Sequence, residues 1–198
     1  MSTGSALWYL SRGTGVVSLV LLTVVIVLGV LTRGGRPLPG LPRFAVAGLH
    51  RNASLLAVAF LAVHIVTAVL DPYVTIGWFA TLVPFVSKYQ TAWIGLGALS
   101  LDLMLAAVVT SLLRQRIGRR VWRAIHLSVY ASWPVALVHA FTLGPDIKTG
   151  ALAWLGVGCV AATAGAVAWR VADDQQPSNI SARNQQVRQD ADRKEVMA

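Results

Sequence analysis

The stretch that decides the fold is FAVAGLHRNASLLAVAFLAVHIVTAVL, residues 44–70, in which Arg51 is the only Asp, Glu, Lys or Arg side chain. A helix of about 20 residues crosses the hydrocarbon layer of a membrane, which is about 30 Å thick. Residues 44–70 are therefore enough for one crossing. Their length, and the lack of turn signals inside the stretch, favour a helix over a strand.

Four further stretches share this character, and they run from about Thr14 to Thr32, Thr91 to Leu113, Val121 to Leu143 and Ala151 to Val171. The composition agrees, because 56% of the residues are apolar and 13% are charged. Soluble domains have about 45–50% apolar residues and about 25% charged residues. We therefore predict an all-α membrane protein, with a bundle of five transmembrane helices over residues 14–172. Residues 1–13 are then a short external N-terminus, and the polar residues 173–198 are a disordered cytoplasmic tail.

The basic residues predict how the bundle is oriented. Arginines gather in residues 33–43 and 114–123, and Arg170 follows the fifth span, whereas the opposite side has only Arg12, Lys88 and Lys148. Basic loops stay in the cytoplasm, so we expect the N-terminus outside and the C-terminus inside. The chain is then a multi-pass protein of a cell membrane, of the bacterial plasma membrane type. The net charge of +9 lies in these loops, so nucleic acid is not an expected partner.

Residues 71–90 connect the second and third stretches on the predicted outer side. They are too polar and too interrupted by proline to cross a membrane. The apolar side chains of this segment predict a short helix that lies on the outer membrane interface. These side chains are Ile76, Trp78, Phe79, Leu82 and Phe85.

All four histidines fall in two of the spans. His50 and His64 are 14 residues apart, which at 100° per residue places them within about 40° of each other and about 21 Å apart along one helix. His126 and His139 are 13 residues apart, and a straight helix would leave them about 140° out of phase. Pro134 lies between them, and we infer that it helps to turn His139 toward the second span.

Since the second and fourth spans run in the same direction, the histidines form two pairs at different depths. His50 and His126 lie near the cytoplasmic end, and His64 and His139 lie further out. Imidazoles from two facing helices suit the axial positions of haem iron, so we predict two non-covalent haem b groups, each held by two histidines. The alternatives are a hydrogen-bonded packing role, a proton path, or a zinc or copper site.

Three charged residues near these histidines are further candidates. Arg51 and Arg123 could bind haem propionates, or they could be ordinary anchors at the cytoplasmic boundary. Asp102 lies deep in the third span, where a carboxylate is costly, and either proton uptake or a structural role would explain it. The single cysteine, Cys159, excludes a thiolate metal cluster and covalent haem attachment through paired cysteines.

The H-x13-H and H-x12-H pattern on two parallel spans resembles the ferric reductase-like transmembrane domain. That domain is shared by ferric reductases, NADPH oxidases and the haem-binding subunit of the methionine sulfoxide reductase. The segments WYLSRGTGVVSLVLLTVVIVLGVLTR and TSLLRQRIGRRVWRAIH resemble it too, and the resemblance covers about residues 8–172. It implies a diheme b-type cytochrome in which His50 and His126 hold the inner haem, and His64 and His139 hold the outer one.

The departures from that family bear on the expected partners. Many relatives have six spans and a flavin and nicotinamide domain, whereas this sequence shows five spans and no glycine-rich dinucleotide motif. The expected donor is therefore a cytoplasmic flavin reductase, a free flavin or a quinol. The expected acceptor is an external molecule, such as ferric iron or oxygen, or a partner reductase. The alternatives are a quinone-linked membrane cytochrome b and a non-redox proton or metal transport protein.

Overall fold

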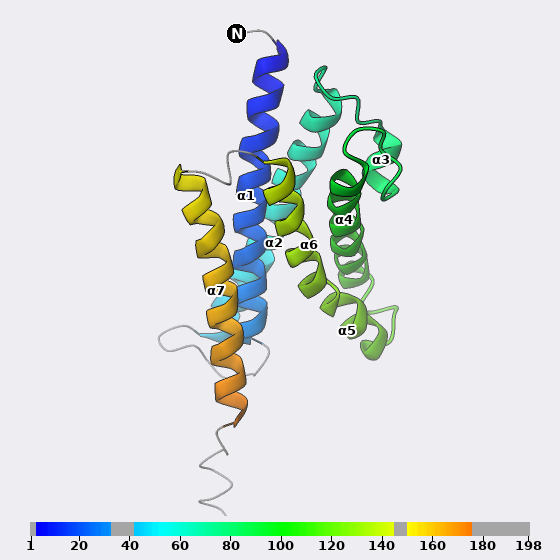
Figure 1. Ribbon diagram of the computed structural model, residues 1–198. Coiled ribbons are helices and arrows are strands. Elements are labelled where there is room, and N and C mark those ends of the chain that lie inside the picture. The colour runs from blue at the N-terminus through cyan, green and yellow to red at the C-terminus, as the bar shows by residue number, and fades with distance from the viewer. Residues whose placement is uncertain (1–2, 33–41, 145–149, 176–198) are drawn as a thin grey trace, which may run out of the picture.

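The computed structural model describes residues 3–32, 42–144 and 150–175 (Figure 1). These residues form seven helices and no strand, and the helices are α1 (Thr3–Thr32), α2 (Arg43–Leu70), α3 (Trp78–Leu82), α4 (Thr91–Leu112), α5 (Arg119–Leu127), α6 (Val129–Leu143) and α7 (Gly150–Gln175). Five segments are long and apolar enough to cross a membrane, with α5 and α6 together making one of them. The predicted all-α bundle of five transmembrane helices is therefore confirmed.

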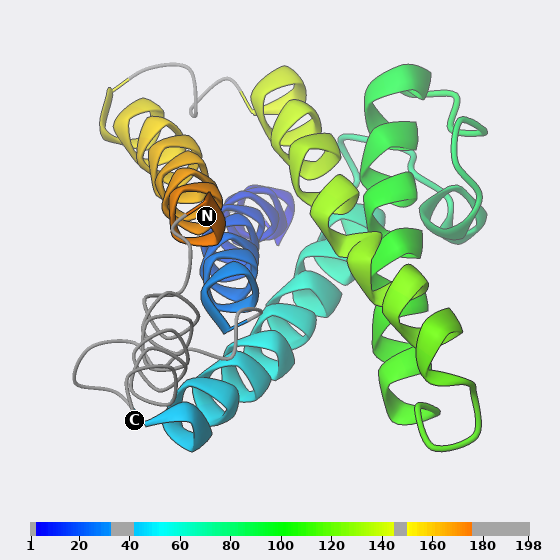
Figure 2. The same cartoon turned by 90° about the horizontal axis from the view of Figure 1, so that it is seen from below.

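The bundle is built from two helix pairs. α2 packs along α1, and α6 packs along α4, while α1 also contacts α6 and α7 (Figures 1 and 2). α2 and the α5–α6 segment run in one direction, and α1, α4 and α7 run in the other (Figure 1). The first and last described residues therefore lie at opposite ends of the bundle. This arrangement places the histidine-bearing helices side by side in the same direction.

The first helix begins at Thr3, eleven residues before the expected start at Thr14. The additional residues include the cation of Arg12. In the structure the Arg12 side chain is half-buried and donates a hydrogen bond to the Leu143 carbonyl at 3.2 Å. Its guanidinium carbon lies 4.5 Å from the ring centre of Trp8. Because the guanidinium is paired inside the protein, the helix can continue through it. Residues 3–13 thus belong to α1, and their location on the outer side stays a prediction.

The last helix ends at Gln175, so the helix takes in the first residues of the predicted tail. The rest of that tail, residues 176–198, lies outside the described residues. A short helix is present in the segment 71–90 as α3, which is shorter than the apolar pattern indicated, and its place at the membrane interface stays a prediction. It contains Trp78, Phe79 and Leu82, while Ile76 and Phe85 lie outside it.

The fourth span is interrupted at Ser128, and α6 runs through Pro134 without a break. The Ser128 N–H bonds to the Ile125 carbonyl at 3.0 Å, and its hydroxyl donates to the same oxygen at 2.6 Å. A turn with bonds of this i to i−3 type rotates the chain by about 120° per residue instead of about 100°. The extra rotation of about 20° per residue has the direction that the histidine spacing requires, and it supplies part of the missing rotation of about 140°. The part that Pro134 plays in turning His139 stays a prediction.

Candidate functional site

The structure brings the four histidines together as two pairs across the gap between the helix pairs. His50 from α2 faces His126 from α5, and His64 from α2 faces His139 from α6. The ring centres are 6.4 Å apart in both pairs. The ring planes make angles of 63° in the first pair and 85° in the second. Two equal separations at two depths indicate a repeated site.

The separation of 6.4 Å has the size that one metal ion between two imidazoles requires. An imidazole nitrogen binds a transition metal at about 2.0–2.1 Å and lies about 1.2 Å from its ring centre, so two axial rings should have centres about 6.4–6.5 Å apart. No three His, Cys, Asp or Glu side chains among the described residues form a cluster for a metal ion. Two protein ligands per site fit a cofactor that supplies the remaining ligands itself, as a porphyrin does.

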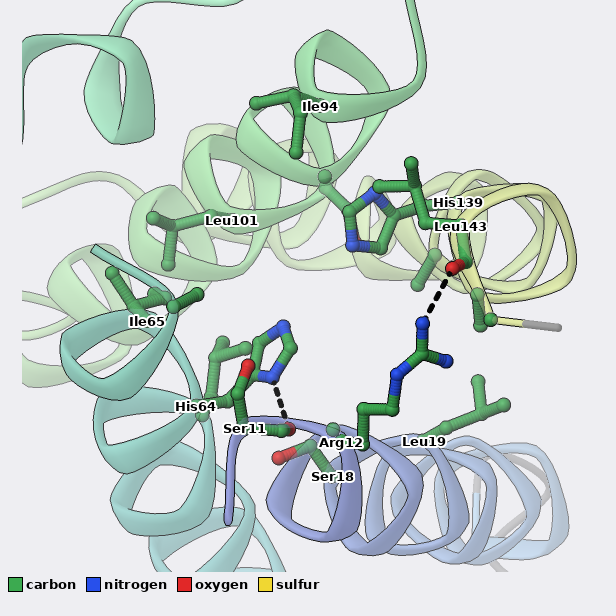
Figure 3. Close-up of a pocket in the computed structure, with 18 of the residues that line it drawn as sticks. Ser11, Arg12, Ser18, Leu19, His64, Ile65, Ile94, Leu101, His139 and Leu143 are labelled. Carbon is green, nitrogen blue, oxygen red and sulfur yellow. Dashed lines mark hydrogen bonds between the residues drawn. The ribbon is translucent and has the colours of Figure 1, made fainter. Parts of the chain in front are cut away.

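The outer pair lines a cavity of about 770 Å³, which lies within the range of about 300–1,000 Å³ for pockets that hold cofactors and ligands. The walls come mainly from α1, α2, α4 and α6. His64 and His139 point into it from opposite sides (Figure 3). The cavity is thus placed where a planar group between the two rings would need room.

Both outer rings are fixed through their Nδ1 atoms. Nδ1 of His64 lies 2.8 Å from the Ser11 carbonyl, and Nδ1 of His139 lies 2.7 Å from the Trp93 carbonyl. A carbonyl can only accept, so in the neutral ring the hydrogen must sit on Nδ1. Nε2 then keeps its lone pair. Metal-binding histidines typically have this second-shell contact, which sets the tautomer and orients the ring.

The inner pair is held differently. Nδ1 of His126 lies 3.3 Å from the Ser111 hydroxyl, which also accepts a hydrogen bond from the Trp122 indole at 3.3 Å. The Trp122 ring stacks on His126, with centres 5.0 Å apart and planes 20° apart. Nδ1 of His50 is buried and makes no hydrogen bond with the described residues. The inner ligand His126 is therefore held by side chains, whereas both outer ligands are held by backbone carbonyls.

Arg12 is a residue that the sequence reasoning did not connect with the histidines. It lines the same cavity as His64 and His139, and its guanidinium reaches across to the end of α6 (Figure 3). The two predicted propionate candidates, Arg51 and Arg123, are exposed and do not line that cavity. The sequence did not indicate that Arg12 lies near the histidines, because this position requires α1 to begin well before Thr14.

Other central residues serve the packing between the two pairs. Trp133 is buried and donates from its indole to the Thr23 hydroxyl at 2.9 Å, which ties α6 to α1. Ser100 donates to the Ser132 carbonyl at 3.0 Å, which ties α4 to α6. Asp102 is half-buried on α4 and does not line the cavity, although its neighbour Leu101 does.

A family model described as the ferric reductase like transmembrane component matches residues 14–137. The matched range contains His50, His64 and His126, and His139 follows it by two residues. Neither the curated proteins nor the solved structures contain a match to this chain.

Proposed function

Because the chain belongs to the ferric reductase-like transmembrane family, we propose that it is a diheme b-type electron-transfer protein that carries electrons across a membrane. His50 and His126 would hold the inner haem, and His64 and His139 the outer one. Electrons would pass from a donor on the cytoplasmic side to an acceptor on the outer side. The membrane would be a bacterial plasma membrane, with the chain as a multi-pass protein.

The observation that carries this proposal is the repeated separation of 6.4 Å between facing imidazoles. A proton path or a packing role does not require two pairs with the same spacing. A bis-histidine iron does, because its two metal–nitrogen bonds fix the distance between the rings. The sites are offset by the 14 residues between His50 and His64, or about 21 Å along α2.

When bound, haem iron supplies the one-electron redox chemistry. The protein residues position and shield it. Ser11 and Trp93 keep the outer rings in the tautomer with a bare Nε2. The buried Trp133 packs with apolar side chains that include Leu22, Ile26 and Val30 of α1. Arg12 is a cation on the wall of the outer cavity, where it can bind a carboxylate.

The proposal also concerns partners. Since the sequence shows no dinucleotide-binding motif, a cytoplasmic flavin reductase, a free flavin or a quinol would supply the electrons. An external molecule or a partner reductase would receive them.

The optical spectrum of the purified protein tests this function. We expect a reduced-minus-oxidised spectrum of low-spin b-type haem, and a pyridine haemochrome assay that gives two haems per chain. A redox titration should resolve two one-electron steps. A protein that folds but contains no haem, although the cells have a sufficient haem supply, would contradict the proposal and favour a transport role. One haem per chain would contradict the diheme assignment.

A further inference from the structure

We propose that three glycines, Gly15, Gly29 and Gly97, are positioning residues for the haem ligands. Each lies on a neighbouring helix, under a histidine ring. Gly15 and Gly97 lack the side chain that would cover the carbonyl four residues earlier, so that the Nδ1 hydrogen of the ligand can reach it. Gly29 leaves room beside His50, whose Nδ1 makes no such bond with the described residues. This inference rests on the proposed haem function, which it extends from the ligands to the surfaces against which they lie.

The first contact is between α1 and α2. His64 lies so close to Gly15 that an added Cβ would be 2.9 Å from both Cε1 and Nδ1 of the ring. The same ring bonds to the carbonyl of Ser11 at 2.8 Å, and Ser11 precedes Gly15 by four residues. Any larger residue at 15 would push the ring away from that carbonyl.

The second contact repeats this arrangement between α4 and α6. A Cβ at Gly97 would lie 2.5 Å from Cε1 and 2.7 Å from Nδ1 of His139. That ring bonds at 2.7 Å to the carbonyl of Trp93, which again lies four residues before the glycine. Two unrelated helices thus use the same spacing of carbonyl and glycine for the two outer ligands.

Helix geometry explains the spacing of four. Each Cβ in an α-helix is tilted toward the N-terminus and covers the preceding turn. A carbonyl at residue i already accepts the N–H of residue i+4, but it has a second lone pair. The side chain at i+4 normally shields that lone pair. A glycine at i+4 exposes it to a partner from another helix.

The third contact follows from the antiparallel packing of α1 and α2. Gly15 and Gly29 are 14 residues apart, as are His64 and His50, so a step along one helix matches a step back along the other. His50 accordingly lies near Gly29, but less tightly, since an added Cβ would be 3.6 Å from Cε1 of the ring and 3.4 Å from the Tyr130 hydroxyl oxygen. The carbonyl four residues earlier belongs to Val25, whose backbone lies close to the ring, although Nδ1 of His50 makes no hydrogen bond with the described residues. The looser contact at Gly29 thus goes with the absence of this bond.

The test compares alanine variants of the three glycines with two matched controls. Gly156 is a control for crowding, because an added Cβ would lie 2.6 Å from Cζ of Phe141, which is not a ligand. Gly158 on α7 is a control for substitution itself, because nothing lies within 4 Å of its added Cβ and it does not line the cavity. The readouts are haem content per chain, the midpoint potential of each haem, and the low-spin spectrum.

Gly15→Ala and Gly97→Ala should each weaken or release the outer haem, with affinity lowered by about 10–100-fold, as is typical when a second-shell partner of a metal ligand is lost. The inner haem should stay, and it reports that the variant is folded. Gly29→Ala should have a smaller effect, confined to the inner haem. Gly158→Ala and Gly156→Ala should keep two haems with unchanged potentials.

Unchanged potentials and haem content in both Gly15→Ala and Gly97→Ala would overturn the inference. So would an equal loss in Gly156→Ala, because crowding alone would then explain the effect. If Gly97→Ala does not fold, Gly15→Ala decides the test, because its added Cβ overlaps less with the histidine ring. If the wild-type protein binds no haem, the proposed function fails by itself. The inference then predicts that ¹⁵N spectra show an Nδ1–H tautomer for His64 and His139 that the Gly15→Ala and Gly97→Ala variants lose.

Discussion

The atoms that hold the Nδ1 side of each imidazole differ between the two sites. In the outer pair both partners are backbone carbonyls, which cannot donate, so the tautomer is fixed. In the inner pair the partner of His126 is the Ser111 hydroxyl, which can donate or accept, and His50 has no such bond. Outer-shell bonds of this kind raise the basicity of a metal-bound imidazole. A more basic imidazole favours ferric over ferrous iron.

A prediction for Ser111 follows from this difference. Because Trp122 already donates to the hydroxyl, a metal-bound His126 should donate its Nδ1 hydrogen to the same oxygen. Ser111→Ala should then make His126 a poorer donor to iron, raise the midpoint potential of the inner haem and weaken its binding by about 10-fold. Redox titration followed optically would measure both effects.

The control for Ser111 is its neighbour Thr110. The Thr110 hydroxyl donates to the Ala106 carbonyl at 2.7 Å and has no bond to a histidine, so Thr110→Val should leave both haems unchanged. Trp122→Phe keeps a ring over His126 but removes the indole donor, and it should shift the inner potential less than Ser111→Ala does. A Ser111→Ala variant in which only the outer haem changes would contradict the assignment of the sites.

At the scale of the elements, apolarity and length were enough to predict the five spans. The start of α1 and the turn at Ser128 were not predictable in the same way. The first depends on a partner far along the chain, the Leu143 carbonyl, and the second depends on a local bond to the Ile125 carbonyl that apolar periodicity does not indicate. Arg12 can lie inside a helical span because the Leu143 carbonyl and Trp8 receive it. Similarly, the periodicity of residues 44–70 placed His50 and His64 on one face, whereas the direction of His139 depended on a backbone turn. The contacts to carbonyls and glycines left no mark in composition or periodicity.

The turn at Ser128 gives a prediction about helix phase. An alanine inserted after Ala136 leaves the bonds of Ser132 and Trp133 in place and rotates His139 by about 100°. Because His139 already faces His64 in the structure, this insertion should remove the outer haem and leave the inner one. Haem content and the optical spectrum would measure the loss.

A straight helix would give the opposite result. The insertion would then make the histidine spacing 14 residues, which is within about 40° of full turns, and the outer haem would be retained. The same insertion after Gly144, beyond the end of α6, should leave both haems in place and serves as the control. Retention of two haems in the first variant would contradict the pairing of His139 with His64.

At the scale of the whole molecule, α2 and the α5–α6 segment run in the same direction, so the two histidine pairs lie at two depths of the bundle (Figure 1). If the arginine-rich segments 33–43 and 114–123 lie in the cytoplasm, the pair of His50 and His126 is the inner one. The cavity around His64 and His139 then belongs to the outer half. For electrons to cross the membrane through both sites, one histidine pair must exchange electrons with each side.

The last prediction therefore concerns sidedness, and it uses His126→Ala and His64→Ala in sealed vesicles of known orientation, with a reporter at the C-terminus that should read cytoplasmic. Each substitution leaves its partner imidazole facing an open position on the iron, and it should disable one haem only, since the sites are about 21 Å apart along the helix.

In His64→Ala, a reductant on the cytoplasmic side should still reduce the inner haem, but no acceptor on the outer side should be reduced. In His126→Ala, the outer haem should stay oxidised from that side and accept electrons from an impermeant reductant outside. If both folded variants behave alike from both sides, the two pairs do not act in series. An externally located C-terminus would reverse the assignment of inner and outer sites while leaving the series intact.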